Sequence, residues 1–158
     1  MTFRRYHILF LYFALLVCLA CQRERKPRYI IGVSQCSEDL WRQTMNEELK
    51  REVALYQADA EVLIRSVKDD TPKQIADIEW FIEQKVDVLV VSPNESEACT
   101  PVIEKAYQQG IPVILVDRKI ATESYTAYVG ANNYQIGKEA GLYAIGVLKG
   151  KGNIAEVR

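Results

Sequence analysis

Apolar and polar positions fall into two alternating patterns from residue 29 onward. Short runs of aliphatic and β-branched residues predict strands at residues 29–34, 61–67, 86–91, 111–116 and 127–130. Between these runs, apolar residues recur every three or four positions, which predicts helices at residues 38–57, from residue 71 past residue 82, around residues 102–109, and at residues 133–148. A last strand is predicted at residues 153–157. The chain therefore consists of repeated strand–helix units.

The spacing of apolar residues also predicts which face each helix buries. Thr71 is the predicted N-cap of the second helix, with Pro72 in its first turn and Gln74 completing a capping box. In the first helix, one stripe runs through Trp41, Met45, Leu49, Val53 and Tyr56. The inward residues of the other helices are predicted to be Ile75, Ile78 and Ile82, then Val102, Ile103, Ala106 and Tyr107, then Ile136, Ala140, Tyr143 and Val147.

The third predicted strand indicates the fold class. It is aliphatic without interruption from Val88 to Val91, as expected for a strand buried on both faces of a parallel sheet. Parallel strands need crossover connections, and here each connection between the first four strands contains a helix. We therefore predict an α/β fold with a doubly wound parallel sheet and helices on both faces.

Polar residues follow the predicted strands at the end where such sheets bind ligands. Residues 34–38 follow the first strand, residues 92–96 the third, and Asp117 and Arg118 the fourth. Since the carboxyl ends of parallel strands share one edge, we expect these groups to form a single rim. Asn132 and Asn133, after the fifth strand, are further candidates for it. Asp87 lies at the opposite edge.

The chemistry of this rim favours a sugar over a nucleotide. No Gly-x-Gly-x-x-Gly or Gly-Lys-Ser/Thr loop is present. Sugar hydroxyls donate to carboxylates and accept from guanidinium groups, and the C–H face of a sugar packs on an aromatic ring. The candidate ligand-binding residues are Ser34, Glu38, Trp41, Ser92, Asp117 and Arg118.

Most of the candidate residues also have a purely structural explanation. Asp117 and Arg118 could be exposed charges at a strand end, and Trp41 could belong to the core. Glu38 could favour the positive end of a helix, and Ser92 could simply end a strand. Asn132 and Asn133 could cap the following helix.

Composition excludes several function classes. The 158 residues include 20 Lys and Arg and 21 Asp and Glu, for a net charge of −1, so there is no basic field for a nucleic-acid partner. The single histidine is His7, within an apolar leader. The folded part therefore lacks a histidine for a catalytic triad, a zinc site or phosphotransfer. We expect no cofactor, no metal site and no enzymatic activity in this chain.

The N-terminus predicts export. Residues 8–21 carry no charge, which suits a signal peptide better than a membrane span of roughly 20 residues. Cys21 follows a small residue and could be a lipidated first residue, although Cys18 departs from the usual processing site. A plain signal peptide, an uncleaved anchor and lipidation all remain open. The expected location is the periplasm, with a membrane tether through the leader.

Two cysteines lie in the predicted folded part. Cys36 and Cys99 could pair in an exported protein. Spacing alone does not show pairing, and we favour two separate, half-buried thiols.

Three runs, residues 31–34, 86–94 and 110–118, resemble periplasmic sugar-binding proteins of the ribose and galactose type. The resemblance covers residues 29–158. It is closest to the periplasmic sensor domains of hybrid two-component regulators, which residues 34–37, Trp41-Arg42, 92–95 and 116–119 resemble.

The resemblance implies roles for the candidate residues. Positions matching Asp117 and Arg118 hydrogen-bond to sugar hydroxyls, and an aromatic matching Trp41 packs on the sugar ring. Positions matching Ser34, Glu38 and Ser92 line the cleft. Glu38 and Leu40 stand where relatives often have asparagine and an aromatic, so the identity of the sugar stays open.

The resemblance further implies two lobes that close over the ligand. The expected organisation is a signal peptide or anchor at residues 1–21, a basic linker at 22–28, a sugar-binding lobe at 29–130 and the start of an incomplete second lobe at 131–158. We therefore expect this chain alone to bind sugar weakly or not at all.

The leading functional hypothesis is sugar binding as the periplasmic sensor part of a two-component signalling protein. The alternative is the substrate-binding lipoprotein of a sugar transporter. A sugar-responsive repressor would need a helix-turn-helix where this chain has its apolar leader, and Asp117 with Glu38 as an acid/base pair is the weakest hypothesis. A homodimer of the full-length protein is left open.

Overall fold

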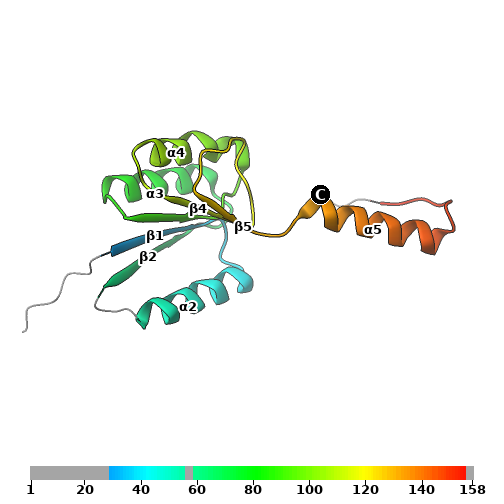
Figure 1. Cartoon of the computed structure of the whole chain (residues 1–158), viewed down its shortest axis with the longest axis horizontal. Coiled ribbons are helices and arrows are strands. Elements are labelled where there is room, and N and C mark those ends of the chain that lie inside the picture. Colours follow the sequence, from blue (N-terminus) through cyan, green and yellow to red (C-terminus); the bar gives the residue numbers. More distant parts are fainter. Residues whose placement is uncertain (1–28, 56–58, 156–158) are drawn as a thin grey trace, which may run out of the picture.

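The structure, a computed structural model, describes residues 29–55 and 59–155 (Figure 1). The leader, the basic linker, Cys21 and Tyr56 lie outside the described residues, as does the end of the strand predicted at 153–157. In chain order the elements are β1 (Tyr29–Gln35), α2 (Leu40–Ala54), β2 (Ala60–Ser66), α3 (Thr71–Glu83), β3 (Val88–Val91), α4 (Ser96–Gln108), β4 (Val113–Val116), β5 (Ala127–Val129) and α5 (Asn133–Leu148).

The five strands form one parallel sheet in the order β2-β1-β3-β4-β5. Helix α2 covers one face of the sheet, and α3 and α4 cover the other (Figure 1). The predicted α/β parallel sheet is confirmed. From β1 the chain moves to β2 on one side and then returns to β3 on the other. The strand order therefore reverses between β1 and β3, which is where sheets of this kind bind ligands.

The core lies between the sheet and the α3–α4 layer. Helix α3 buries Ile78 and Phe81, and α4 buries Ile103, all packed with Leu89 and Leu115 of the sheet. The ring of Phe81 lies so close to β1 that a Cβ on Gly32 would come within 2.8 Å of it. A glycine in the middle of this strand is thus explained by close packing against α3.

Helix α2 packs more loosely than its sequence pattern predicts. Trp41, at the start of the predicted stripe, is exposed, and Met45, Leu49 and Val53 are half-buried. The buried residue that this helix contributes is Arg42. Burial of the predicted apolar stripe therefore does not by itself explain how α2 is packed on the sheet.

The start of α3 differs from the prediction. Asp70, not Thr71, is the N-cap, and its carboxylate accepts a hydrogen bond from the backbone N–H of Lys73 at 2.9 Å. Pro72 lies in the first turn as predicted. The expected capping box does not form, because Gln74 is buried and points toward the strand ends.

Helix α5 extends away from the sheet (Figure 1). The prediction that Ile136, Ala140, Tyr143 and Val147 face inward is wrong in this structure, since α5 buries no residue. No strand forms at residues 153–155; they run back alongside α5, away from any strand with which they could pair. In the part of the chain that is described, no helix has the length and apolarity needed to cross a membrane.

Candidate ligand-binding site

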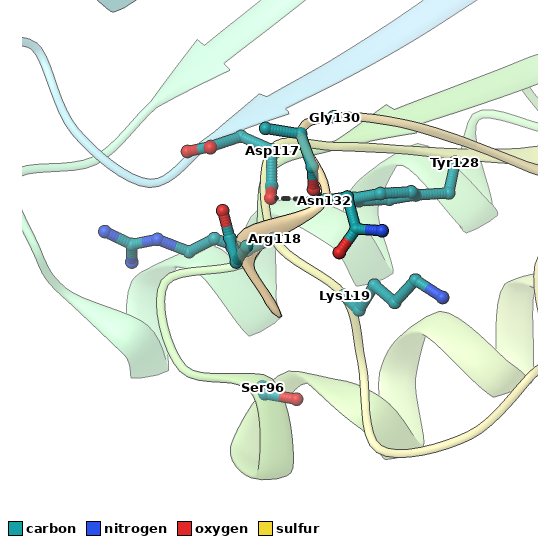
Figure 2. Close-up of a pocket in the computed structure, with 9 residues that line it drawn as sticks. Ser96, Asp117, Arg118, Lys119, Tyr128, Gly130 and Asn132 are labelled. Atoms are coloured by element: carbon teal, nitrogen blue, oxygen red, sulfur yellow. Dashed lines mark hydrogen bonds between the residues drawn. The ribbon is translucent and has the colours of Figure 1, made fainter. Parts of the chain in front are cut away.

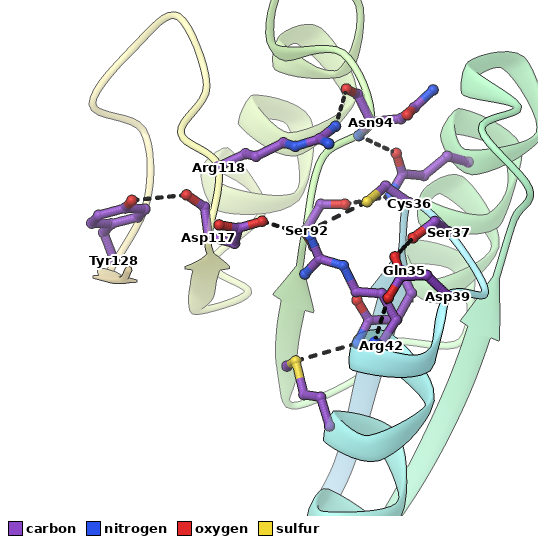
Figure 3. Close-up of polar contacts among 12 residues, drawn as sticks. Gln35, Cys36, Ser37, Asp39, Arg42, Ser92, Asn94, Asp117, Arg118 and Tyr128 are labelled. Atoms are coloured by element: carbon purple, nitrogen blue, oxygen red, sulfur yellow. Dashed lines mark hydrogen bonds and ion pairs between the residues drawn. The ribbon is translucent and has the colours of Figure 1, made fainter. Parts of the chain in front are cut away.

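The predicted rim exists at the carboxyl ends of β1, β3 and β4. The backbone N–H of Ser92 donates to the carbonyl of Ser34 at 3.0 Å, and Arg118 Nη1 donates to the carbonyl of Asn94 at 2.8 Å. Figure 3 shows Ser92 and Arg118 next to Asp117, with Asn94 at the far end of the Arg118 side chain. Groups more than 80 positions apart in sequence (34 and 117) therefore meet at one edge, as the parallel topology requires.

Asp117 is held from several sides and remains accessible. Its backbone has a φ of 68°, a left-handed conformation that aspartate tolerates better than most residues. Its N–H donates to the carbonyl of Val129 at 2.8 Å, and its carbonyl accepts from the hydroxyl of Tyr128 at 2.9 Å. The side chain of Asp117 is 49% exposed. A fixed, half-exposed carboxylate suits an acceptor for ligand hydroxyls.

The carboxylate of Asp117 is paired with Arg42, which is not among the predicted site residues. Arg42 Nη2 lies 2.6 Å from Asp117 Oδ2. The guanidinium also lies over the ring of Trp41, with its carbon 4.4 Å from the ring centroid, a cation–π geometry. The Trp41-Arg42 pair was visible in the sequence, but nothing there showed that Arg42 reaches Asp117 across 75 positions.

Trp41 and Glu38 both lie on the exposed part of the rim. Trp41 is 56% exposed, so the alternative that places it in the core is wrong. The side chain of Glu38 is 43% exposed and forms an ion pair with Lys68 at 3.3 Å. Both side chains are accessible to solvent, and their binding roles stay predictions.

Ser34 and Ser92 lie beneath the rim. Both are buried. Gln74 connects them, since its amide nitrogen donates to Ser34 Oγ at 3.2 Å and to the Ser92 carbonyl at 2.9 Å. Its amide oxygen accepts from the backbone N–H of Asn94 at 2.8 Å. Gln74 thus fixes the loop after β3, a role that its sequence position did not reveal.

A pocket of about 790 Å³ opens beside Asp117 (Figure 2). Most of its wall comes from the residues that follow β4 and from the stretch after β5 that leads into α5, and α4 and β5 contribute one residue each. It is lined by Ser96, Asp117, Arg118, Lys119, Tyr128, Gly130, Ala131, Asn132 and Asn133. Asn132 is the N-cap of α5, and its side chain accepts a hydrogen bond from the N–H of Gln135 at 3.1 Å. The prediction that Asn132 could cap this helix is therefore confirmed.

Two charged groups near the rim have shifted pKa values. The hydrogen bond with Tyr125 raises the pKa of Lys119, which keeps this pocket residue cationic. The hydroxyl of Ser37 and the backbone N–H of Arg42 lower the pKa of Asp39, the N-cap of α2. Both effects favour the charged form at neutral pH.

The two cysteines are unpaired and buried, not half-buried as predicted. Cys36 Sγ lies 3.8 Å from Ser92 Oγ, and Cys99 Sγ lies 3.6 Å from Gln74 Oε1. Burial raises the pKa of Cys99, so its thiol stays protonated. Among the described residues, no three His, Cys, Asp or Glu side chains are grouped to hold a metal ion.

Comparison with known proteins identifies the family. Residues 31–158 match the family model described as a periplasmic binding protein domain. The chain therefore belongs to this family of periplasmic proteins, and the resemblance drawn from its sequence is confirmed.

Solved structures that are similar to this chain include sugar-binding proteins. The fructose-binding periplasmic domain of a hybrid two-component system is 53% identical with a TM-score of 0.74, over 79% of this chain and 41% of that one. A galactofuranose-binding protein is 28% identical with a TM-score of 0.67, over 78% and 42% of the two chains.

Curated relatives are binding proteins, not enzymes. The ribose import binding protein of Bacillus subtilis is 30% identical over 61% of this chain and 32% of its own length. The multiple sugar-binding periplasmic protein of Azospirillum brasilense is 31% identical over 80% and 36%. The chain spans about a third of the length of these relatives.

Proposed function

We propose that this chain contributes the first half of a sugar-binding site and senses a sugar for a two-component signalling protein. The observation that carries the proposal is the rim at the ends of β1, β3 and β4, where Asp117 presents a fixed carboxylate beside Arg118. The 53% identity to a fructose-binding domain of a hybrid two-component system supports both the ligand class and the sensor role.

The candidate residues divide into two groups. Asp117, Arg118, Glu38 and Trp41 are exposed at the rim, so they are proposed to contact the sugar directly. Ser34 and Ser92 are buried beneath them and are proposed to shape the floor. Carboxylate, guanidinium and indole groups together match the hydroxyls and the apolar face of a sugar ring.

The second lobe is proposed to begin after residue 130. Helix α5 exposes large apolar side chains, among them Ile136, Leu142, Ile145 and Val147. A 16-residue helix with such a surface gains its stability from packing. The relatives are more than twice as long as the matched segment, so residues of a second lobe are the proposed packing partner.

The alternative is a binding protein that delivers sugar to a transporter. It is favoured by the names of curated relatives, such as the ribose import binding protein. The leader separates the two hypotheses, and the proposed membrane tether depends on it. Mass spectrometry of the mature N-terminus should find an uncleaved leader for a sensor, whereas a lipidated Cys21 favours the transporter hypothesis.

Isothermal titration calorimetry on the full-length protein tests the sugar-binding proposal. Fructose, ribose, xylose and galactose are titrated in turn, and at least one is expected to bind with a micromolar Kd. If none of these sugars binds, the proposed function is wrong. The 158-residue chain alone is expected to show no micromolar binding, and tight binding by it would contradict the proposed need for a second lobe.

A further inference from the structure

Strand β2 forms one edge of the sheet. It is the first strand in the order β2-β1-β3-β4-β5, and among the described residues no strand pairs with its outer side. All seven residues of β2 are half-buried or exposed, whereas the last four residues of β1 beside it are buried. An edge strand of this kind presents backbone N–H and C=O groups to any chain that can align with it.

The hydrogen bonds to β1 show which backbone groups of β2 point outward. The carbonyl of Asp59 accepts from the N–H of Tyr29 at 2.8 Å, and the N–H of Val67 donates to the carbonyl of Gln35 at 3.1 Å. Since backbone groups alternate in direction along a strand, the odd-numbered residues of β2 bond to β1. The N–H and C=O groups that point toward the outer edge therefore belong to residues 60, 62, 64 and 66.

This edge lacks the features that usually prevent strands from pairing. Strand β2 contains no proline or glycine, and it pairs with β1 without a bulge through seven successive residues. Its centre is the aliphatic run Val62-Leu63-Ile64. Natural proteins normally shorten, bend or charge such an edge against self-association, so an uninterrupted aliphatic edge indicates a partner strand.

The two charged residues of β2 identify this partner as a second copy of the same strand. Glu61 and Arg65 lie on the α3 face of the sheet, because Arg65 bonds to Asp77 of α3 and side chains alternate along a strand. They stand two positions before and two positions after Leu63. In an antiparallel pair centred on Leu63, Glu61 of each copy faces Arg65 of the other. A parallel pair in register would oppose like charges, which is unfavourable.

The same register satisfies the outward backbone groups. With Leu63 opposite Leu63, Val62 of one copy lies opposite Ile64 of the other, so two residues that both point outward exchange their hydrogen bonds. Glu61 and Arg65 then form a pair without backbone hydrogen bonds, in which opposing side chains come closest. A shift by one residue would break the hydrogen bonds, and a shift by two would separate the charges. Charge and backbone direction therefore select one register.

Arg65 can contact a second carboxylate without leaving the first. Its hydrogen bond to Asp77 uses Nη1, and its side chain is 39% exposed. A guanidinium has five N–H donors, so other donors of this group can serve Glu61 of the second copy. The ring of Trp80 lies 3.8 Å from the guanidinium carbon and holds the planar group in place. Glu61 is itself exposed.

We propose that this protein forms a symmetric dimer through β2, in which the two strands pair antiparallel about Leu63 and two Glu61–Arg65 ion pairs flank the centre. The two sheets then form one continuous sheet. The contact lies at the middle of β2 and not at the carboxyl ends of the strands, so it leaves the proposed sugar site open. The dimer does not depend on the identity of the ligand.

Cysteine cross-linking of the full-length protein tests the register. Leu63→Cys should form a disulfide-linked dimer under mild oxidation, because the two opposed Cα atoms would lie about 4.5 Å apart. Val62→Cys is the matched control, since its counterpart lies diagonally opposite at about 7–8 Å, beyond disulfide reach. The wild type gives the background from the native cysteines. Ala60→Cys combined with Ser66→Cys places small changes at opposed positions and should also cross-link, even if Leu63→Cys does not fold.

Charge reversal tests the ion pairs. Adding Glu61→Lys to Leu63→Cys should slow cross-linking about 10-fold or more, because each dimer then opposes two lysines to two arginines. Adding Glu83→Lys is the control, since it makes the same charge change at an exposed residue of α3 and should leave the rate unchanged. Neither charge reversal should alter sugar affinity in calorimetry.

Two results would overturn the proposal. One is cross-linking at the wild-type background both in Leu63→Cys and in the paired Ala60→Cys and Ser66→Cys variant. The other is an equal rate of cross-linking with Glu61→Lys and with Glu83→Lys. A protein that binds sugar without cross-linking disproves only the dimer, whereas one that cross-links without binding sugar disproves only the proposed function.

Discussion

Two arginine–aspartate pairs in this protein are built alike and are exposed in opposite ways. Arg42 pairs with Asp117, and Arg65 of β2 pairs with Asp77 of α3; each arginine lies over a tryptophan ring. In the first pair the arginine is 5% exposed and the aspartate 49%. In the second pair the arginine is 39% exposed and the aspartate 8%.

The difference shows which pair can serve a ligand. An exposed carboxylate held by a buried cation can accept hydrogen bonds from outside the protein. The buried carboxylate of Asp77 is not accessible to a ligand. Its ion pair with Arg65 therefore joins α3 to β2. Similar chemistry thus serves the proposed binding at the rim in one pair and joins a strand to a helix in the other.

Charge removal at the two aspartates should separate these roles most strongly. Asp117→Asn keeps an oxygen for Arg42 and tolerates the positive φ, but it loses charged hydrogen bonds to the sugar. We expect affinity to fall about 100-fold in calorimetry on the full-length protein.

Asp77→Asn is the matched control for this prediction. It should leave sugar affinity unchanged and lower the free energy of unfolding in urea by about 1–2 kcal/mol, since a partly exposed arginine limits the cost. Equal loss of sugar affinity in the two variants would remove the proposed distinction between the pairs.

Gln74 connects the two regions, because it lies in α3 one turn before Asp77 and supports the loop after β3. Gln74→Leu should leave the Asn94 N–H and the Ser92 carbonyl without this buried partner. We expect about 2 kcal/mol lower stability in urea denaturation and a several-fold weaker sugar affinity. Gln84→Leu, at the exposed end of the same helix, should change neither quantity, and an equally small effect of Gln74→Leu would contradict this role.

The fold and the rim could be predicted from local patterns. Aliphatic strands at regular intervals define a parallel sheet, and a parallel sheet places its carboxyl ends together. Asp117, Arg118 and Ser92 were therefore located by topology, before any side-chain contact was known.

Contacts made by single side chains could not be predicted in the same way. The apolar stripe of α2 suggested that Trp41 faces inward. In the structure Arg42 is buried instead, where it pairs with Asp117 at the end of β4. Gln74 fits the sequence pattern of a capping box. The sequence cannot show that its side chain bonds instead to the ends of β1 and β3. The apolar stripe of α5 gives no information on whether a partner is present.

The two tryptophans allow a finer comparison of the same two regions. Trp41→Ala should weaken sugar binding about fivefold, because it removes about 1 kcal/mol of ring packing. Trp80→Ala removes a half-buried ring that packs against Phe81, so it should lower the melting temperature and leave sugar affinity unchanged. Both quantities can be measured by calorimetry, and a loss of affinity in Trp80→Ala alone would reverse the assignment.

The smallest expected effect concerns Asp39, which begins the helix that carries Arg42. Its folded pKa is lowered below 3.8 by the Ser37 hydroxyl and the Arg42 N–H, so its contribution to stability is present above that pH and lost as the pH falls through the folded pKa. The stability difference between wild type and Asp39→Ala in urea should therefore be largest near neutral pH and shrink in acid. Ser37→Ala should weaken this pH dependence, because it removes the hydrogen bond that lowers the pKa of Asp39 most. A difference that stays constant with pH would show that Asp39 acts only by its shape and not by its charge.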